Sequence, residues 1–393
     1  MKPNTLILLG LVAAAAAVLI MRLPSPQPAP AQILAGGEAG GAAARYLTPR
    51  SFDADGLSDL FERVARTGGV AHLPAGVYRI NRTIKIDGMG PIRIEGESHG
   101  IFVRPRGDGF RAQPTRLVWT GEPGGTMLHI SGSVGQAFSH IHFDGAGRAG
   151  RLVHLTARPG FGTGAQRFDR VLFSNADVAI QAGEREGDFN CADVLYDDVA
   201  ILACNVGLRV VNHQSVNHFF KWLSVHQVQT AFDFQRGGNL LVDGWQAGTF
   251  DLMLRVGYGG PNAGIFRFVS GRPEMNGLTG RYARLAEVEP EDCAQVIFEA
   301  TQETGGPYDA KLPDNAKDPV FRIGRGGMVV VRNHYHFRPA FELTGPGSYI
   351  NQDSRWQIPI AQAIPDAARA PAGTIRITGA ADPVGVPLPD IRR

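Results

Sequence analysis

The sequence predicts an all-β solenoid, a chain that coils on itself so that short parallel strands stack. Three observations favour this fold class: an excess of glycine, short runs with apolar residues at alternate positions, and a weak internal repeat. Glycine accounts for 50 of the 393 residues, whereas average usage is about 7%. Each glycine inside a helix costs about 1 kcal/mol relative to alanine, which excludes long helical bundles. The glycines follow no three-residue period, which excludes a collagen helix.

The charge balance and the cysteines exclude several functional classes. The 39 basic and 37 acidic residues give a net charge of +2, so no overall field draws the protein to nucleic acid, and we expect no nucleic-acid partner. The three cysteines, Cys191, Cys204 and Cys293, lack the C-x-x-C spacing of a zinc site. We expect them to be small apolar residues of the core.

The first 50 residues have the pattern of an export segment followed by a linker. Lys2 precedes an uncharged apolar run from Leu6 to Met21, and Ala29-Pro30-Ala31 offers a cleavage site between small residues. Residues 1–31 are therefore predicted to be a signal peptide, with an uncleaved membrane anchor as the alternative. Residues 32–50 are predicted to be a flexible linker. The expected location is periplasmic or secreted, or anchored to the inner membrane and facing the periplasm.

One amphipathic helix is predicted between residues 55 and 69. Its apolar residues recur at i, i+3, i+4 and i+7, namely Leu57, Leu60, Phe61 and Val64. Asp53 or Asp55 can cap its start, and Gly68 and Gly69 end it. We expect this helix to cover one end of the solenoid.

After Gly69 the period changes to two, and a repeat of stacked turns can be aligned. An apolar residue is followed seven positions later by another in four successive units: Phe173 and Ile180, Ile201 and Leu208, Val225 and Phe232, and Trp245 and Leu252. This alignment predicts that Trp245 packs inward. Some 280 residues at about 20 to 30 per turn give on the order of ten coils.

The opening of this region resembles a known superfamily. The segment LFERVARTGGVAHLPAGVYRINRTIKI joins a helix that ends in Gly-Gly to a Leu-Pro-x-Gly-x-Tyr turn, through Gly68, Gly69, Leu73, Pro74, Gly76 and Tyr78. It is similar to the start of the pectate-lyase-like right-handed parallel β-helix superfamily. That group includes polygalacturonase-like hydrolases, polysaccharide lyases, mannuronan epimerases and phage tailspikes. The resemblance implies a single-stranded right-handed parallel β-helix over residues 51–360, with an N-terminal capping helix. Residues 361–393 are predicted to be a Pro/Ala-rich C-terminal tail.

The candidate site lies between Asp188 and Asp243, where Asp, His, Lys and Trp are most concentrated. Stacked coils bring outward side chains of aligned residues within about 5 Å, and the alignment places Asp197 beside Lys221 and His226 between Leu202 and Gln246. The candidate catalytic residues are His218, His226, Lys221, Arg236, Asp197, Asp198 and Asp243. The candidate substrate-binding residues are Trp222, His213 and Gln246.

Two reactions fit these residue types. A lyase or C5-epimerase removes the proton next to the carboxyl group of a uronic acid, which requires a base and a cation or donor. His218 or His226 could be that base, with Lys221 or Arg236 facing the carboxylate.

A glycosidase instead requires two carboxylates, for which Asp197 or Asp198 with Asp243 is the candidate set. The Asn-Thr-Asp and Gly-His-Gly elements of the polygalacturonase-like hydrolases are missing, and only the Asp197-Asp198 pair is present. The structural alternative is that Asp197 and Lys221 form a surface ion pair.

No cofactor or metal is predicted. His334 and His336 have the spacing of two metal ligands on one strand, but no third ligand can be identified from the sequence. Ca²⁺ is unsupported because no cluster of acidic residues stands out. We expect an exported lyase or C5-epimerase that acts on an acidic polysaccharide. The alternatives are a non-catalytic polysaccharide-binding or assembly scaffold and a polygalacturonase-like hydrolase. Membrane contact is expected only through an uncleaved N-terminal segment.

Overall fold

The computed structural model describes residues 45–100, 114–186, 188–257, 263–289, 293–304, 318–336, 341–356, 375–379 and 390–392. The predicted export segment and most of the predicted linker lie outside these residues. Within them, no helix is both long and apolar enough to cross a membrane.

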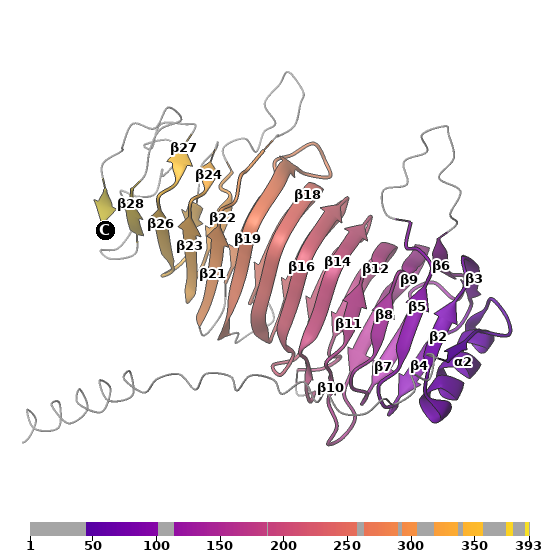
Figure 1. Ribbon diagram of the computed structural model, residues 1–393. Helices are drawn as coiled ribbons and strands as arrows, with labels where there is room; N and C mark the ends of the chain where they lie inside the picture. The colour runs from indigo at the N-terminus through magenta and orange to yellow at the C-terminus, as the bar shows by residue number, and fades with distance from the viewer. Residues whose placement is uncertain are drawn as a thin grey trace, which may run out of the picture. The chain divides into compact units, whose positions relative to one another are not determined.

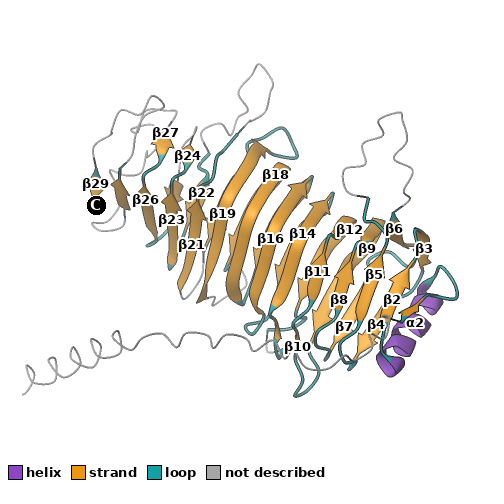
Figure 2. Ribbon diagram, in the orientation of Figure 1, coloured by secondary structure: helices purple, strands orange, loops and turns teal. Residues whose placement is uncertain are grey.

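One helix and a long series of short strands make up the described part of the chain (Figures 1 and 2). The helix is α2 (Ala54–Thr67). The strands of the first half are β1 (Tyr46–Leu47), β2 (Val70–Leu73), β3 (Gly76–Ile80), β4 (Ile84–Asp87), β5 (Arg93–Gly96), β6 (Thr115–Trp119), β7 (Thr126–Ser131), β8 (Ala137–Ser139), β9 (His142–Thr156), β10 (Thr163–Gly164), β11 (Arg167–Asp169), β12 (Leu172–Ala182), β13 (Cys191–Ala192), β14 (Val194–Leu202) and β15 (Val206–Val210). Those of the second half are β16 (Val216–His226), β17 (Val228–Phe234), β18 (Gly238–Val256), β19 (Ala263–Asn276), β20 (Arg284–Val288), β21 (Cys293–Glu299), β22 (Phe321–Ile323), β23 (Gly327–Arg332), β24 (Tyr335–His336), β25 (Phe341–Leu343), β26 (Ser348–Gln352), β27 (Arg355–Trp356), β28 (Ile375–Thr378) and β29 (Ile391–Arg392).

The strands pair in parallel from turn to turn and form a right-handed β-helix of about 11 turns, which confirms the predicted fold class. A parallel pair normally needs a long crossover; here the crossover is the rest of each turn. The ladder also enters the segment predicted to be a tail, because β28 pairs with β26. In the predicted linker, β1 pairs with β2.

Helix α2 covers the N-terminal end of the solenoid, as predicted (Figure 1). The Asp53 carboxylate accepts a hydrogen bond from the Gly56 N–H at 2.8 Å and caps the helix. Gly68, with φ 73°, ends it. The predicted apolar stripe is buried, namely Leu57, Leu60, Phe61 and Val64.

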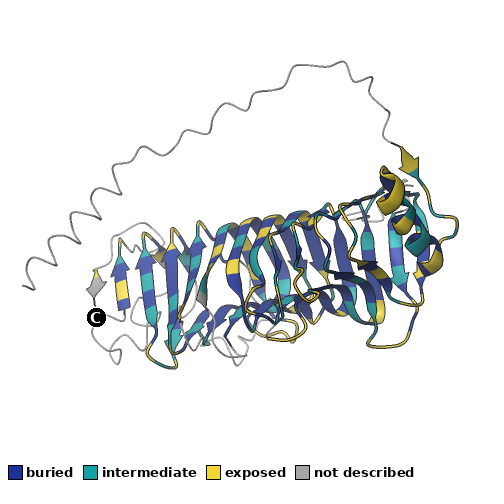
Figure 3. Cartoon of the chain, turned by 90° about the horizontal axis from the view of Figure 1, so that it is seen from below, coloured by how far each residue is buried: buried dark blue, intermediate teal, exposed yellow. Residues whose placement is uncertain are grey.

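Each turn of the solenoid has three faces, which we define here by the residues of three turns near the middle of the solenoid. The first face comprises residues 194–197, 218–221 and 240–243, and the second comprises 199–202, 223–226 and 245–247. The third face comprises residues 206–210, 228–234 and 250–256. Along the first face, buried residues alternate with more exposed ones, whereas the second and third faces contain longer buried runs. Figure 3 shows the distribution of burial along the solenoid.

A single residue with positive φ makes the corner between the first and second faces in turn after turn. These corner residues follow strand positions that pair in register, and they are His140, Arg170, Asp198, Trp222, Gly244, Ser270, Ala300, Asn333, Asp353 and Gly379. The left-handed conformation costs a non-glycine residue about 1–2 kcal/mol. The hydrogen-bonded ladder on both sides of the corner must therefore offset this cost.

The core is a stack of aromatic and aliphatic side chains. Phe138, Phe168, Tyr196 and Phe220 stack on successive turns with ring centroids 5.2, 5.5 and 4.0 Å apart. Trp245 is buried, as predicted. Of the three cysteines, two are buried in the core, but Cys293 is exposed at the start of β21, which corrects the expectation for that residue.

The predicted alignment of turns is correct at its start and then slips by two residues. Phe173 pairs with Ile201, and Ile201 pairs with Val225, as predicted. Val225 then pairs with Ala247 instead of Trp245. Likewise, Phe232 pairs with Leu254 instead of Leu252. A shift of two residues keeps every side chain on its own face, so the apolar pattern cannot reveal this error.

Gly271 allows the buried ring of Trp245 to pack against the next turn. A Cβ at Gly271 would lie 2.0 Å from Cε2 of Trp245. We expect Gly271→Ala to lower the free energy of unfolding by about 1–3 kcal/mol through overpacking. Denaturant unfolding measures this change. The control is Gly90→Ala, because no atom lies within 4 Å of a Cβ there. Equal stability of the two variants would contradict the inward packing of Trp245.

Candidate functional site

Five of the predicted site residues gather on the first face and its corner. Asp197, Lys221 and Asp243 pair in register on β14, β16 and β18, which confirms that the first two positions lie side by side on neighbouring turns. Asp198 and Trp222 follow them at the corner, and the Trp222 side chain is 50% exposed. This cluster therefore presents one ammonium group between two carboxylates, beside an exposed aromatic ring.

The Asp197 carboxylate pairs with the guanidinium of Arg167 at 3.6 Å. The Trp222 ring lies above the next turn, where a Cβ at Gly244 would be 2.9 Å from Cε3 of Trp222. An exposed, flat indole in this position can stack on a sugar ring.

His218 does not belong to this cluster, because its side chain points into the core. It is fully buried, with its ring 6.3 Å from that of Tyr196. Burial lowers the pKa of His218 to about 3, so the imidazole is neutral. Residues an odd number of positions apart on a strand face opposite sides, so His218 and Lys221 diverge. His218 thus cannot act as a base on a polymer outside the solenoid.

His213 and Arg236 lie at a third place, in the connections that precede β16 and β18. Both contact Glu186, at 3.1 Å from the imidazole Nε2 and 3.3 Å from the guanidinium Nη2. Their hydrogen bonds lower the pKa of the Glu186 carboxyl. Lys221 and Asp243 lie near the far ends of those first-face strands, so the predicted residues do not converge in one groove.

His226 lies on the second face, in a mostly apolar depression of about 420 Å³. The depression is lined by Leu172, Ala200, Leu202, Ser224 and Thr249, among others. His226 is opposite Leu202, as predicted. Burial lowers the pKa of His226, and the nearby Glu274 opposes this shift.

The predicted contact between His226 and Gln246 is wrong, because Gln246 pairs with Ser224. Its amide donates a hydrogen bond to the Ser224 hydroxyl at 2.8 Å. Gly248 instead faces the imidazole, since a Cβ there would lie 2.1 Å from Nδ1 of His226. On the following turn Arg272 pairs with Gln246 and is exposed. Ser224, Gln246 and Arg272 therefore form a column of polar groups across three turns, and His226 lies two residues beyond Ser224 on the same strand.

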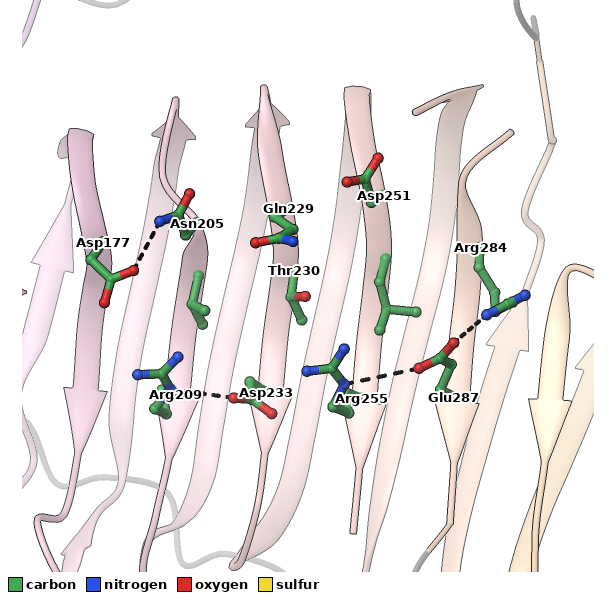
Figure 4. A pocket seen from close by; sticks show the side chains of 12 residues that line it. Asp177, Asn205, Arg209, Gln229, Thr230, Asp233, Asp251, Arg255, Arg284 and Glu287 are labelled. Carbon is green, nitrogen blue, oxygen red and sulfur yellow. Dashed lines mark hydrogen bonds and ion pairs between the residues drawn. The ribbon is translucent and has the colours of Figure 1, made fainter. Parts of the chain in front are cut away.

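The third face carries a polar trough whose residues are not among the predicted site residues (Figure 4). Its cavity volume is about 360 Å³. One edge is a row of acidic and amide side chains, Asp177, Asn205, Gln229 and Asp251. The other edge is a row of alternating charge, Arg209, Asp233, Arg255 and Glu287. Between the rows lie Val206, Thr230 and Leu252, and Arg284 closes one end.

The charged row belongs to a longer ladder in which the sign alternates at every turn. The register pairs these residues in the order Arg209, Asp233, Arg255, Glu287, Arg322 and Glu342. Nε of Arg209 is 3.3 Å from Oδ2 of Asp233, and Nε of Arg322 is 3.0 Å from Oε2 of Glu342. We call this series the charged ladder. Its first four members, Arg209, Asp233, Arg255 and Glu287, line the trough.

The aligned sequence contains the signal for this ladder, one residue after each inward anchor of the third face. Leu208 and Phe232 were aligned correctly, and they precede Arg209 and Asp233. The predicted alignment put Leu252 where the structure has Leu254. It therefore put Met253 beside Asp233, in the place that Arg255 occupies in the structure. The neutral methionine concealed the alternation.

Comparisons with known proteins establish the fold. No family model matches the chain, and no curated protein matches its sequence. A catalytic-domain variant of a GH87 alpha-1,3-glucanase in complex with nigerose superimposes with a TM-score of 0.50 at 11% identity, over 91% of this chain and 70% of that one. An endo-xylogalacturonan hydrolase from Aspergillus tubingensis gives 0.47 at 11% identity, over 87% and 94%. A pectate lyase gives 0.34 at 10% identity, over 86% and 79%. The superposition at a TM-score of 0.50 shows that the chain shares the parallel β-helix fold of that catalytic domain.

Proposed function

We propose that the protein is exported and binds an extended acidic polysaccharide in the trough of the third face. The observation that carries this proposal is the pair of polar rows that cross successive turns with a groove between them (Figure 4). Neighbouring turns lie about 4.8 Å apart. A polymer that lies across the strands therefore meets a new pair of polar side chains at every turn.

The chemistry of the two rows suits a ligand rich in hydroxyl groups. Carboxylates such as Asp177 and Asp251 accept hydrogen bonds, guanidinium groups donate them, and the amides of Asn205 and Gln229 do both. Asn205 donates to Asp177 at 2.9 Å, which fixes the orientation of both side chains. Such preorganised groups lose little conformational freedom when a ligand binds.

The guanidinium groups gathered at one end of the trough are the groups that could hold a polymer with carboxylates. The Glu287 carboxylate pairs with three arginines: closely with Arg284, and at 3.9 Å with both Arg255 and Arg322. Arg322 also pairs with Glu342. Three guanidinium groups thus gather around one carboxylate at this end, while the lining of the trough as a whole has four carboxylates and three arginines. A uronic acid bound there would receive charge-assisted, bidentate hydrogen bonds.

The ion pairs of the trough carboxylates favour binding over hydrolysis. Asp233 and Glu287 lie two turns apart in the charged ladder, with Arg255 between them. Both carboxylates are held by arginines, whereas the two carboxyl groups of a glycosidase act on the substrate as acid and as nucleophile or base.

Replacing the trough arginines tests the binding site. We expect Arg255→Gln and Arg284→Gln each to weaken binding of alginate or pectate about tenfold or more, because each removes charge-assisted hydrogen bonds. Titration calorimetry measures the affinity, and thermal unfolding confirms that the variants are folded. The matched control is Arg82→Gln, whose guanidinium pairs with Asp55 of helix α2. If Arg82→Gln weakens binding as much as the trough variants, or if a neutral glucan binds as tightly as the uronates, the proposal is wrong.

Export is the part of this proposal that rests on residues 1–31. We expect the full chain, expressed in a Gram-negative host, to appear outside the cytoplasm, because the apolar run from Leu6 to Met21 follows the single positive charge of Lys2. A chain that lacks residues 1–31 should remain in the cytoplasm. Cell fractionation with immunodetection measures both, and equal distribution of the two chains would contradict export.

A second candidate function, lyase or C5-epimerase activity, is favoured by the depression around His226. Burial lowers the pKa of His226, so its imidazole is neutral near pH 7 and can accept a proton. Gln246 and Arg272 lie on the two following turns and could hold the carboxylate of a uronic acid. The substrate proton next to that carboxylate would move to the imidazole.

His226→Gln tests this second function. We expect the variant to lose formation of unsaturated products, measured by absorbance, and any change of sugar configuration, measured by NMR. His213→Gln should retain both, since His213 contacts Glu186 elsewhere. Because the pKa of His226 is lowered, the neutral base persists below pH 6.5, and activity should fall only as pH drops through the lowered value. Unaltered turnover in His226→Gln would exclude this site, whereas the binding proposal would still stand.

A further inference from the structure

Three buried side chains near the C-terminal end of the solenoid converge on one point. Glu303 follows β21, while His334 precedes β24 and His336 ends it. The three residues are at most 1% exposed. One potential ligand atom from each lies within 4.8 Å of the other two. The two histidines are two residues apart in the sequence, and the fold supplies the third group from 31 residues before His334.

The hydrogen bonds within this cluster leave buried polar atoms unsatisfied. One oxygen of Glu303 contacts both histidines, at 2.7 Å from Nε2 of His334 and 3.0 Å from Nδ1 of His336. Within the described part of the chain, the other Glu303 oxygen and Nδ1 of His334 have no hydrogen-bond partner. A buried polar group without a partner costs about 1–3 kcal/mol. The arrangement is therefore incomplete as a hydrogen-bond network.

A buried carboxylate also requires a compensating positive charge. Removing a carboxylate from water costs several kcal/mol unless a cation is nearby. Either a proton shared with the two imidazoles or a metal ion can supply that charge. Two imidazoles and one carboxylate form a ligand set that binds Zn²⁺ and leaves one further coordination position.

We propose that Glu303, His334 and His336 bind a divalent transition-metal ion, with Zn²⁺ as the best match. Bonds of about 2.0–2.1 Å in tetrahedral geometry separate ligand atoms by about 3.3 Å. The two nitrogen–oxygen distances of 2.7 and 3.0 Å therefore need to widen by about 0.3–0.6 Å. Rotamer adjustments of the three side chains are sufficient for such a change.

A neighbouring amide is placed to orient one of the ligands. The amide of Asn351 lies 3.4 Å from Nε2 of His336 and 2.8 Å from the Tyr349 hydroxyl. The oxygen and nitrogen of an amide are assigned from their surroundings. In the structure the Asn351 NH₂ group donates to the Tyr349 hydroxyl; with the amide turned by 180°, its oxygen would accept from that hydroxyl and from Nε2–H of His336. That contact directs the lone pair of Nδ1 toward the metal, as partners of metal-bound histidines commonly do.

The expected role of the ion is structural, because its ligands are buried. It would join the turn that follows β21 to the turn that contains β24, beyond the trough and the depression around His226. The site is therefore independent of the proposed function.

Metal content of the full-length protein tests the proposal. After expression with zinc and extensive dialysis, we expect about one zinc ion per chain by mass spectrometry, and a chelator should lower the melting temperature. Cobalt in the same site should give the visible absorption of a tetrahedral complex. Glu303→Gln keeps the shape of the side chain and should lose the cobalt spectrum and most of the zinc. His213→Gln, which alters an exposed histidine, should retain both.

A protonated His–Glu–His cluster gives the opposite result. In that case the wild-type protein would hold less than about a tenth of an equivalent of zinc or cobalt, and the chelator would leave the melting temperature unchanged. If Glu303→Gln fails to fold, His334→Ala and His336→Ala are compared with wild type by the cobalt spectrum. An undiminished spectrum in either folded variant would also overturn the proposal.

Discussion

In-register stacking of parallel turns is the constraint on which the other features of this structure depend. Each strand must pair with the strands one turn before and one turn after it, and the pairing sets a spacing of about 4.8 Å. Residues 20 to 44 positions apart in sequence thus become direct neighbours, as Arg322 and Glu342 or Ile84 and Leu128 do. The repeated corners of positive φ persist because the ladder holds both sides of each corner.

Stacking acts differently on the two sides of a strand. On the inner side, similar apolar side chains stack on one another. For example, the ring of Phe168 lies between those of Phe138 and Tyr196 in a continuous aromatic stack. Outside, neighbouring like charges would repel at this spacing, and the charged ladder from Arg209 to Glu342 alternates in sign. The same rule that stabilises the solenoid therefore produces a row of oriented polar groups along its surface.

The sequence allowed the fold to be predicted more fully than the site. Local patterns are visible directly in the sequence. They include the apolar stripe of the helix, the motif that ends at Tyr78 and the first two steps of the repeat, from Phe173 to Ile201 and from Ile201 to Val225. The inward orientation of His218 could also have been predicted, because His218 lies two residues before the buried Phe220 and residues two apart on a strand face the same side. The trough depends on the register between β17 and β18, which a two-residue slip changes without altering the apolar pattern. Glu303 meets His334 and His336 only through the path of the chain between them, for which the sequence has no periodic signal.

The central claim is that the register of stacked turns makes the trough a binding surface for an extended polymer. Its most direct test is the affinity of a series of uronic-acid oligosaccharides of increasing length. Because the trough crosses the turns from Asp177 to Glu287, roughly 19 Å at 4.8 Å per turn, we predict that affinity rises with each added sugar and levels off once the oligosaccharide spans that length. Affinity that is independent of length beyond a single sugar would contradict the account.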